Sequence, residues 1–324
     1  MRYAVTGATG FVGGAVVRRL LADGHEVVAV VRNPNGATAL LDLGVQVAVG
    51  DLSDIAAMKE AFSGADGVFH LAGWYKIGDR HPEVAWQVNV EGTANVLQAA
   101  KESVTRRVVY TSTCAVNSDT HGSVVDESFE FTGRHISVYD ETKAQAHDIA
   151  RTFSSQPNNP DVVIVMPGGV YGPGDTSPIG RYFRQIASGK RVVASAKLRV
   201  VEAHVDDVAA GHVLAMEKGV RGDSYMLAGE RTDLLAMLSE VAMLTGGPQP
   251  INVPSPMLPV ASRLTGILGK VVPLPTDYSS ESLRVSQASY LGTAAKAHRE
   301  LGWKFRPLHQ GLRETLATEG LLPV

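Results

Sequence analysis

Tyr139 and Lys143 stand four positions apart in the segment Tyr-Asp-Glu-Thr-Lys. On a helix, residues i and i+4 share one face, so the two side chains would be neighbours. An ammonium beside a phenol favours the phenolate and would lower the tyrosine pKa from about 10. Such a phenol can exchange a proton with a carbonyl oxygen near neutral pH. An exposed i,i+4 pair on a surface helix is the alternative explanation of this spacing.

Further polar and aromatic residues follow two valine-rich segments. Thr111, Ser112 and Thr113 come after Arg107–Tyr110, and Trp74 and Tyr75 come shortly after Gly67–Leu71. Ligands of open α/β sheets bind beyond the carboxyl ends of the strands, so a hydroxyl there could bond a substrate oxygen. The aromatic pair would offer apolar surface to the same substrate. Strand-end capping and core packing are the alternatives.

Residues 6–13 read Thr-Gly-Ala-Thr-Gly-Phe-Val-Gly, between a predicted strand and a predicted helix. Gly7 permits a tight turn, and Gly10 lets backbone N–H groups approach a pyrophosphate at the positive end of the helix. Gly13 allows the helix to pack closely on the strand. This context predicts a dinucleotide site, whereas the three glycines alone would also suit a plain turn.

The end of the second predicted strand bears on the choice of dinucleotide. An acidic residue there would bond a free ribose 2′-hydroxyl, but this strand ends Val30-Val31-Arg32-Asn33. Arg32 could pair with a 2′-phosphate, so we expect NADP(H) to be preferred, with NAD(H) possible. An ordinary surface arginine is the alternative. Asp51, followed by Leu52, is placed to bond the adenine amino group.

Strands and helices alternate through the first half of the chain, which predicts a parallel sheet covered by helices. The expected strands are Arg2–Thr6, Glu26–Val31, Val45–Val49, Gly67–Leu71, Arg107–Tyr110 and Val162–Met166. The expected helices are Phe11–Ala22, Ile55–Phe62, Pro82–Ser103 and Ser137–Ser154. We therefore predict an α/β fold, a Rossmann-type doubly wound parallel sheet with helices on both faces and a smaller C-terminal substrate-binding lobe.

The texture of the sequence changes after Pro167. A Gly- and Pro-rich segment precedes helix candidates at Arg181–Ser188 and 232–245, a strand running into a helix at Ala203–Lys218, and a late strand at Gly222–Leu227. Prolines interrupt Pro248–Pro259 and Pro273–Pro275. We assign residues 1–166 to an NADP-binding Rossmann domain and 167–324 mainly to the lobe, with segments around 203–228 returning to the Rossmann sheet.

Composition narrows the class of protein. The 324 residues carry 30 basic and 33 acidic side chains, with no charge block that would suggest nucleic acid. There is a single cysteine, Cys114, and no Cys/His cluster has metal-ligand spacing. No apolar run is long enough to span a bilayer, and the first residues lack a signal sequence. We expect a cytoplasmic protein with a small-molecule substrate and no metal, nucleic-acid or membrane partner.

Taken together, these motifs resemble those of the extended short-chain dehydrogenases/reductases, within the NAD-dependent epimerase/dehydratase superfamily. They occur in the family's order and cover nearly the whole chain. The matching segments are Thr6–Gly13, Asp51-Leu52, His70–Gly73, Asn89–Thr93, Thr111–Thr113, Tyr139-x-x-x-Lys143, Pro167–Pro173 and His204–Val208. Within the family, Trp74–Gly78 and the stretch from Ala210 to Gly219 look most like the dihydroflavonol-reductase-like branch, which includes hopanoid-associated sugar epimerase-like proteins.

The resemblance implies roles for individual residues. Tyr139 matches the general acid/base, Lys143 its partner, Thr113 the active-site hydroxyl and Asn89 a helix asparagine near the site. Matched cofactor-binding positions are Gly7, Thr9, Gly10, Phe11, Val12, Gly13, Arg32, Asp51, Leu52, Leu71, Ala72, Gly73, Thr111, Tyr139, Lys143, Pro167 and Val170. Candidate substrate contacts are Trp74, Tyr75, Thr113, Cys114, Tyr171 and Tyr182. Met166 stands where an arginine is common, which puts that arginine's contact in doubt. Family members are often homodimers, so we expect one here.

Three functional hypotheses follow. The first is an NADP(H)-dependent oxidoreductase that moves a hydride between nicotinamide and a ketone, an aldehyde or a secondary alcohol. The second is an NAD-dependent nucleotide-sugar epimerase or dehydratase, although Val192–Ala203 lacks the nucleotide-binding pattern usual before His204-Val-Asp-Asp. Lys197 and Arg199 could still meet a phosphate there. The third is a non-catalytic NADP sensor, against which the Tyr139, Lys143 and Thr113 set argues.

Overall fold

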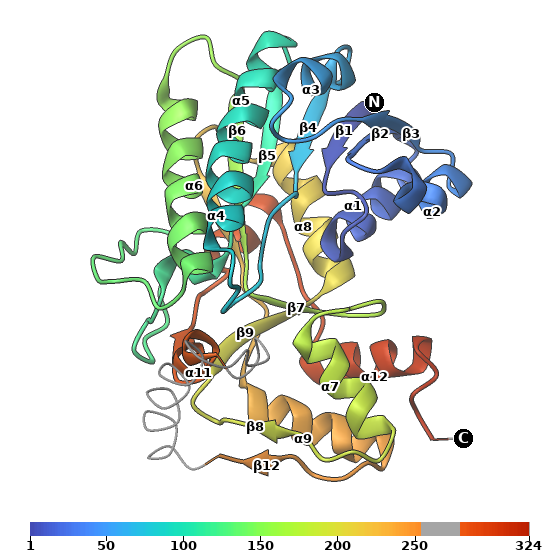
Figure 1. Ribbon diagram of the computed structural model, residues 1–324, viewed down its shortest axis with the longest axis vertical. Coiled ribbons are helices and arrows are strands. Elements are labelled where there is room, and N and C mark those ends of the chain that lie inside the picture. Colours follow the sequence, from blue (N-terminus) through green and yellow to red (C-terminus); the bar gives the residue numbers. More distant parts are fainter. Residues whose placement is uncertain (254–278, 324) are drawn as a thin grey trace.

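The computed structural model describes residues 1–253 and 279–323 (Figure 1). A seven-stranded, wholly parallel sheet forms its centre, in the order β10-β6-β5-β4-β1-β2-β3. The strands are β1 Arg2–Thr6, β2 Glu26–Val31, β3 Gln46–Val49, β4 Gly67–His70, β5 Arg107–Thr111, β6 Asp161–Pro167 and β10 Ser224–Leu227. The chain reverses direction along the sheet between β1 and β4, which is where a doubly wound fold binds its ligand. The predicted fold class is confirmed.

Valine dominates these strands because each is covered on both faces. In β2, the five residues after Glu26 are all buried, and Val108, Val109, Val162 and Val163 are completely enclosed. A β-branched side chain suits the pleated backbone, and each fully buried valine contributes roughly 1.5–3 kcal/mol. The continuous valine runs therefore specify a central sheet and leave little freedom for either face to meet solvent.

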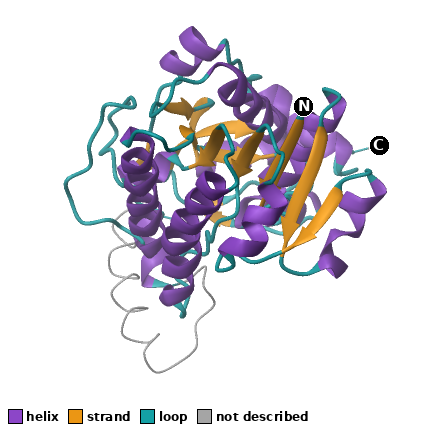
Figure 2. Cartoon of the chain, turned by 90° about the horizontal axis from the view of Figure 1, so that it is seen from above, coloured by secondary structure: helices purple, strands orange, loops and turns teal. Residues whose placement is uncertain are grey.

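Helices cover both faces of the sheet (Figure 2). One layer contains α1 (Phe11–Ala22) and α8 (Val205–Lys218), which pack against each other. The other contains α3 (Ile55–Phe62), α5 (Gly92–Glu102) and α6 (Val138–Ser155). The short helix α2 (Thr38–Asp42) follows a 3-10 turn at Pro34–Ala37, and a second 3-10 turn, Cys114–Asn117, follows β5.

The predicted helix Pro82–Ser103 is built differently from the expectation. It begins as α4 (Pro82–Ala85), widens into a π-helix over Trp86–Glu91, and continues as α5. A π turn is a local insertion that changes which residues share a face, and such turns are frequent at functional sites. Apolar periodicity cannot distinguish this arrangement from a regular helix.

The smaller lobe lies beyond the carboxyl ends of the strands (Figure 1). Its helices are α7 (Pro178–Ala187), α9 (Leu234–Thr245) and α12 (Leu308–Thr318), which enclose a second core that includes Phe183, Leu238 and Leu312. Helix α7 begins three residues before the predicted start, because Ser177 caps it and Pro178 occupies its first position. The short α11 (Ser280–Val285) and a π-helical turn at Ala297–Leu301 follow the undescribed segment.

Short strands join the lobe to the Rossmann part. A second sheet has the order β11-β9-β13, with β7 also pairing with β9, and β12 pairs with β8. These strands are β7 Gly169–Tyr171, β8 Val193–Ala194, β9 Arg199–His204, β11 Glu230–Asp233, β12 Ile251–Asn252 and β13 Ser289–Tyr290. Since β9 leads directly into α8, and β10 follows as an edge strand of the main sheet, the chain returns from the lobe to the Rossmann layers here.

Two proline-rich segments noted in the sequence lie partly or wholly outside the described residues. The Pro-interrupted segment Pro248–Pro259 is described only as far as Val253, and Pro273–Pro275 lies outside the described residues. None of the helices in residues 1–253 and 279–323 combines the length and apolar character that crossing a bilayer requires.

Candidate active site

The glycine turn links β1 to α1 and has the close geometry that its sequence suggests. Gly7 has φ +77°, and a Cβ there would lie 2.5 Å from the Ala72 backbone nitrogen. A Cβ on Gly13 would lie 2.0 Å from the Gly7 carbonyl oxygen. Gly10 is the N-cap of α1 and contributes no capping side chain, so the first turn keeps its backbone N–H groups for other partners. Helix N-termini of this kind favour anions such as phosphate.

Arg32 and Asp51 lie side by side where β2 and β3 end, within electrostatic reach of each other. Arg32 is exposed, and its charge is one of the causes that lower the pKa of Asp51. The largest cause is a hydrogen bond from the Ser53 backbone N–H, 3.0 Å from Asp51 Oδ1, and the Ser53 hydroxyl also bonds that oxygen. The cap of α3 is Asp54, so Asp51 is free of that task. A cation and a hydrogen-bond acceptor thus flank the glycine turn.

The segment Leu71–Gly73 crosses directly over the glycine turn. The Leu71 backbone N–H donates to the Thr6 carbonyl at 3.1 Å, and the Ala72 N–H reaches the Thr6 hydroxyl at 3.4 Å. On the far side of the site, Pro167 is buried at the end of β6, while Val170 in β7 is half-buried. Gly168 between them packs against the Val201 backbone so closely that a Cβ would lie 2.3 Å from its carbonyl oxygen.

Tyr139 stands at the start of α6 beside Thr113. Ser137 caps this helix through the Asp140 N–H, which fixes Tyr139 in the first turn. Burial raises the pKa of the Tyr139 phenol to about 12, and a hydrogen bond with the Thr113 side chain acts in the opposite direction. Thr113 itself caps the Cys114–Asn117 turn by accepting the Ala115 N–H at 3.1 Å. Near pH 7 the phenol is therefore neutral and holds its proton.

Lys143 lies one helical turn further along α6 but has other partners than expected. Its Nζ donates to the Tyr110 hydroxyl at 3.0 Å and to the Thr111 carbonyl at 2.7 Å. Burial lowers the pKa of the ammonium to about 7. The expectation that Lys143 lowers the Tyr139 pKa is not met, because the lysine is directed at β5 and the dominant effect on the phenol is desolvation.

Asn89 lies in the π-helical turn and holds the backbone of Trp74. Its Oδ1 accepts the Trp74 N–H at 2.7 Å, and its Nδ2 donates to the Trp74 carbonyl at 2.8 Å and to the Thr142 hydroxyl at 3.0 Å. Asn89 is therefore a positioning residue for the loop after β4. Along this loop Trp74 is half-buried with Lys76 over its ring, whereas Tyr75 is 58% exposed.

Three other candidate substrate contacts pack against neighbouring protein groups. Cys114 is 2% exposed, donates its thiol hydrogen to the Met166 carbonyl and has a pKa raised by burial to about 12. Tyr171 is completely enclosed in the second core, with its hydroxyl 3.5 Å from the Leu308 carbonyl. Tyr182 packs against that same core. Tyr171 presents no surface to a substrate in this structure, in contrast to the sequence-based expectation.

The structure also reveals groups that the sequence did not single out. His70 and His212 are buried around the end of β5, and His147 is half-buried there. Desolvation lowers the pKa of His70 to about 3 and those of His147 and His212 to about 4. His147 bonds the Ser112 hydroxyl at 2.9 Å, and His212 bonds the Thr111 hydroxyl at 2.9 Å. The residues come from different elements, so no sequence spacing could have grouped them.

Glu281 of α11 is a second unpredicted contact. Its carboxylate accepts the Gly78 N–H at 2.8 Å and the Val138 N–H at the start of α6. Nearby, Tyr290 donates to Asp140 at 3.1 Å. The C-terminal segment thereby ties the loop after β4 to the first turn of the helix that carries Tyr139.

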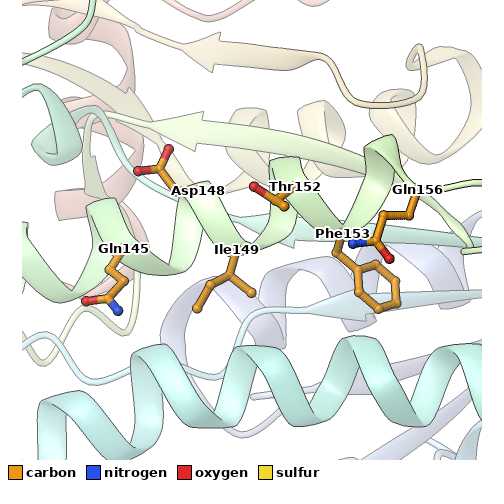
Figure 3. Close-up of a pocket in the computed structure, with 6 residues that line it drawn as sticks. All are labelled: Gln145, Asp148, Ile149, Thr152, Phe153 and Gln156. Atoms are coloured by element: carbon orange, nitrogen blue, oxygen red, sulfur yellow. The ribbon is translucent and has the colours of Figure 1, made fainter.

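No group of three or more His, Cys, Asp or Glu residues in the described ranges is arranged to hold a metal ion. A hollow on the outer face of α6 is lined by Gln145, Asp148, Ile149, Thr152, Phe153 and Gln156 (Figure 3). These residues follow Lys143 along the helix, and none belongs to the set around Tyr139. The candidate site is therefore the region where the ends of β1, β4 and β5 meet the start of α6.

Comparison with known proteins identifies the family to which the chain belongs. The model of the NAD dependent epimerase/dehydratase family matches residues 3–228. A dihydroflavonol 4-reductase-like protein of Synechocystis sp. is 32% identical over 329 residues, covering 96% of this chain and 92% of that protein. The 4-hydroxy-2-methyl-3-oxo-4-farnesyl-3,4-dihydroquinoline-1-oxide ketoreductase of Stigmatella aurantiaca is 31% identical, covering 99% and 97%.

Solved structures agree over the full length of the chain. The crystal structure of gox2253 is 30% identical and has a TM-score of 0.84, covering 99% of both chains. MoeE5 in complex with UDP-glucuronic acid and NAD is 25% identical with a TM-score of 0.79, covering 99% of this chain and 100% of that one. Proteins named as reductases and proteins solved with sugar nucleotides thus share this architecture.

Proposed function

Because this chain belongs to the NAD-dependent epimerase/dehydratase family, whose members are NAD(P)-dependent extended short-chain dehydrogenases/reductases, we propose that it reduces ketones or aldehydes with NADPH. The observation that carries the proposal is the neutral phenol of Tyr139 beside the Thr113 hydroxyl, with Lys143 one turn away. Named reductases among its relatives of similar length support the same reaction class.

The residues around the glycine turn fit a dinucleotide. Gly7 and Gly13 admit no Cβ, and the uncapped first turn of α1 offers backbone N–H groups to a pyrophosphate. Arg32 would pair with a ribose 2′-phosphate, while Asp51 keeps one carboxylate oxygen free of Ser53 for an adenine amino group. Leu71–Gly73 and Pro167–Val170 would border the nicotinamide end. When bound, the nicotinamide supplies or accepts the hydride.

Proton transfer is the task of Tyr139. Reduction of a carbonyl adds a hydride to carbon and a proton to oxygen, and the phenol supplies that proton. With a pKa of about 12, Tyr139 is fully protonated near pH 7 and so is ready to act as an acid. Thr113, which shares a hydrogen bond with the phenol, would bond the same substrate oxygen and hold it within reach.

Lys143 contributes a cation next to this reaction. Its two fixed bonds to Tyr110 and the Thr111 carbonyl leave a third N–H direction, which would serve the cofactor ribose or the tyrosine. A positive charge near the phenolate that forms during reduction stabilises it, and the effect is large where water is excluded. Lys143 would thus favour loss of the proton from Tyr139 once cofactor and substrate exclude water from the site.

The substrate side favours an apolar carbonyl compound. Trp74 and Tyr75 follow β4, where a substrate would lie, and Asn89 fixes Trp74 through its backbone. Aromatic surface leaves the hydroxyls of a sugar without partners, and an unpaired buried hydroxyl costs about 1–3 kcal/mol. An alternative remains a nucleotide-sugar epimerase or dehydratase using NAD, which the likeness to MoeE5 favours. Lys197 and Arg199 would then face the diphosphate.

A panel assay separates the two reactions. Aromatic and aliphatic ketones and aldehydes are followed by the loss of NADPH absorbance, and UDP- and GDP-sugars are followed by chromatography without added cofactor. We expect stoichiometric NADPH consumption with at least one carbonyl compound and no change in the sugar nucleotides. Epimerised or dehydrated sugar nucleotide, with no carbonyl reduced at a measurable rate, would replace the first function by the second.

A further inference from the structure

The position of the Lys143 ammonium is set by two acceptors on β5. The Tyr110 hydroxyl oxygen lies 3.0 Å from Nζ and the Thr111 carbonyl oxygen 2.7 Å from it, and the ammonium also lies 4.7 Å from the centre of the Tyr110 ring. An ammonium has three donors, so these two bonds fix the direction of the third. The direction in which the third Lys143 N–H points therefore depends on Tyr110, a residue that does not itself face the predicted substrate.

Thr93 of α5 lies beside the Tyr110 hydroxyl and acts to lower its pKa, and both residues are buried. Thr93 donates its own hydroxyl proton to the Asn89 carbonyl at 2.6 Å. The Tyr110 oxygen accepts from Lys143 at 3.0 Å.

His70 completes the same arrangement. Its Nε2 lies 3.1 Å from the Thr93 hydroxyl oxygen and its Nδ1 lies 2.8 Å from the Thr6 hydroxyl. Since the Thr93 proton is committed to Asn89, His70 must donate from Nε2 and accept from Thr6 at Nδ1. Burial keeps this ring neutral, because it lowers the pKa to about 3. The His70 Nε2 proton and the Thr93 hydroxyl proton thus each have one defined acceptor.

Asn89 lies in the π-helical turn over Trp86–Glu91, and its carbonyl accepts the Thr93 hydroxyl proton. The Asn89 side chain meanwhile bonds the Trp74 backbone. One residue pair, Asn89 and Thr93, therefore borders both the lysine and the substrate loop.

We propose that Tyr110 is a positioning residue for Lys143. It acts through the lysine and does not touch the reacting atoms. The proposal rests on the proposed catalytic role of Lys143, but its physical content concerns the ammonium alone: the Tyr110 oxygen stabilises the charged form of Lys143 and fixes its direction.

The groups around Lys143 do not titrate near pH 7, so a titration measured there reports on Lys143 itself. The titratable groups that face it are Tyr110 on β5, His70 on β4, and Tyr139 and His147 on α6. Burial raises the pKa values of both tyrosines and lowers those of both histidines. Near pH 7, Lys143 is therefore the member of this set that changes charge.

The test measures the Lys143 pKa by NMR in protein labelled with ¹³C at the lysine Cε, with Lys143→Arg identifying the signal. Tyr110→Phe removes an acceptor of a charged hydrogen bond, so we expect the pKa to fall by about one unit. With NADPH and an accepted carbonyl compound, the alkaline limb of kcat should move to lower pH by the same amount.

Matched controls lose similar bonds elsewhere. Tyr225→Phe removes a buried hydroxyl that accepts the Val220 N–H at 3.1 Å, and Thr315→Val removes a hydroxyl that donates to the carbonyl four residues earlier at 2.8 Å. Both should destabilise the fold without moving the Lys143 pKa. An unchanged Lys143 pKa in Tyr110→Phe, or an equal shift in the controls, overturns the proposal. Because the NMR measurement needs no substrate, a failure of the reductase function would be seen separately, as a wild-type protein without turnover.

Discussion

The carboxyl ends of β1 and β5 are both part of the candidate site, yet they are built in opposite ways. At β1, the turn from Thr6 to Gly13 is shaped by residues within eight consecutive positions, and its chemistry comes from backbone N–H groups. At β5, the side chains of Tyr110, Thr111 and Ser112 are bonded by side chains from α6 and α8. The first is a local structure and the second is a tertiary one.

This difference has a physical consequence for tolerance to change. The turn at β1 contains no ionisable side chain, so it fails only when its backbone is blocked or its neighbouring charges are removed. The end of β5 depends on buried polar groups whose protonation states must be correct, since an unpaired buried polar group costs about 1–3 kcal/mol. Chemistry and acid sensitivity should both map to β5, whereas cofactor selectivity should map to the β1–β2 side.

The largest effect should come from the β5 side of the comparison. Tyr139→Phe removes the proposed proton donor, and we expect turnover to fall by about 10²–10⁴-fold, the usual contribution of general acid–base catalysis. Affinity for NADPH should change little, because the glycine turn is untouched. Steady-state kinetics with an accepted carbonyl compound and NADPH titration measure the two effects. Tyr225→Phe, on β10 outside the candidate site, is the control. Near-wild-type kcat in Tyr139→Phe would remove Tyr139 from its role.

The next effect belongs to the cofactor side. Arg32→Ala should weaken NADPH binding about ten- to a hundredfold, since a charged hydrogen bond contributes roughly 1.5–3 kcal/mol. NADH binding should be nearly unchanged, and kcat at saturating NADPH should be close to that of the wild type. Fluorescence titration of both cofactors measures this, with Arg18→Ala on α1 as the control. Equal wild-type affinities for NADPH and NADH would reject the preference.

Acid sensitivity should be specific to β5. Burial lowers the pKa of His212 to about 4. The imidazole therefore stays neutral in the folded protein between pH 6.5 and pH 4, whereas in the unfolded chain it becomes protonated below about pH 6.5. The contribution of the neutral imidazole to the free energy of unfolding is fully present above pH 6.5 and is lost as the pH falls towards 4. The loss is about 2 kcal/mol at pH 5. His212→Gln removes this proton linkage, so it should lose less stability than the wild type between pH 7 and pH 5.

Urea unfolding at the two pH values measures the difference, and His25→Gln, outside the β5 cluster, is the control. Asp140 acts in the opposite direction, because its pKa is raised by burial to about 6 and its protonation favours the folded state. This contribution is common to wild type and variant and cancels in the comparison. Equal losses in wild type and His212→Gln would show that the imidazole is protonated in the folded protein at pH 5.

The smallest effect is expected at Cys114. Burial encloses the thiol and raises its pKa to about 12, so little thiolate is available to an alkylating reagent. Iodoacetamide at pH 7.5 should leave the native enzyme unmodified and active, while the urea-unfolded chain should react with one equivalent. Mass spectrometry counts the added groups. Rapid alkylation of the native protein that NADPH prevents would instead place the thiol at the open site.

The parts predicted well from the sequence are those with a local cause. The strand and helix order followed from valine runs and apolar periodicity, and the glycine turn followed from three residues between a strand and a helix. The hydrogen-bond partners of Lys143 were not predicted, because they come from a part of the sequence distant from the lysine. The i,i+4 spacing suggests Tyr139, but the buried Tyr110 and the Thr111 carbonyl approach from another strand and compete for the same donors.

The sequence by itself determined the fold class and the glycine turn, and it singled out Tyr139 and Lys143 as candidates, because each depends on the types and spacing of residues close together in the chain. Only the tertiary structure decided which protons those residues hold and where they point. The Tyr139 and Lys143 pKa values are governed by burial, and burial is a property of the assembled layers. The positions of Thr93, His70 and Tyr110 around one ammonium likewise arise only when β4, β5, α5 and α6 come together.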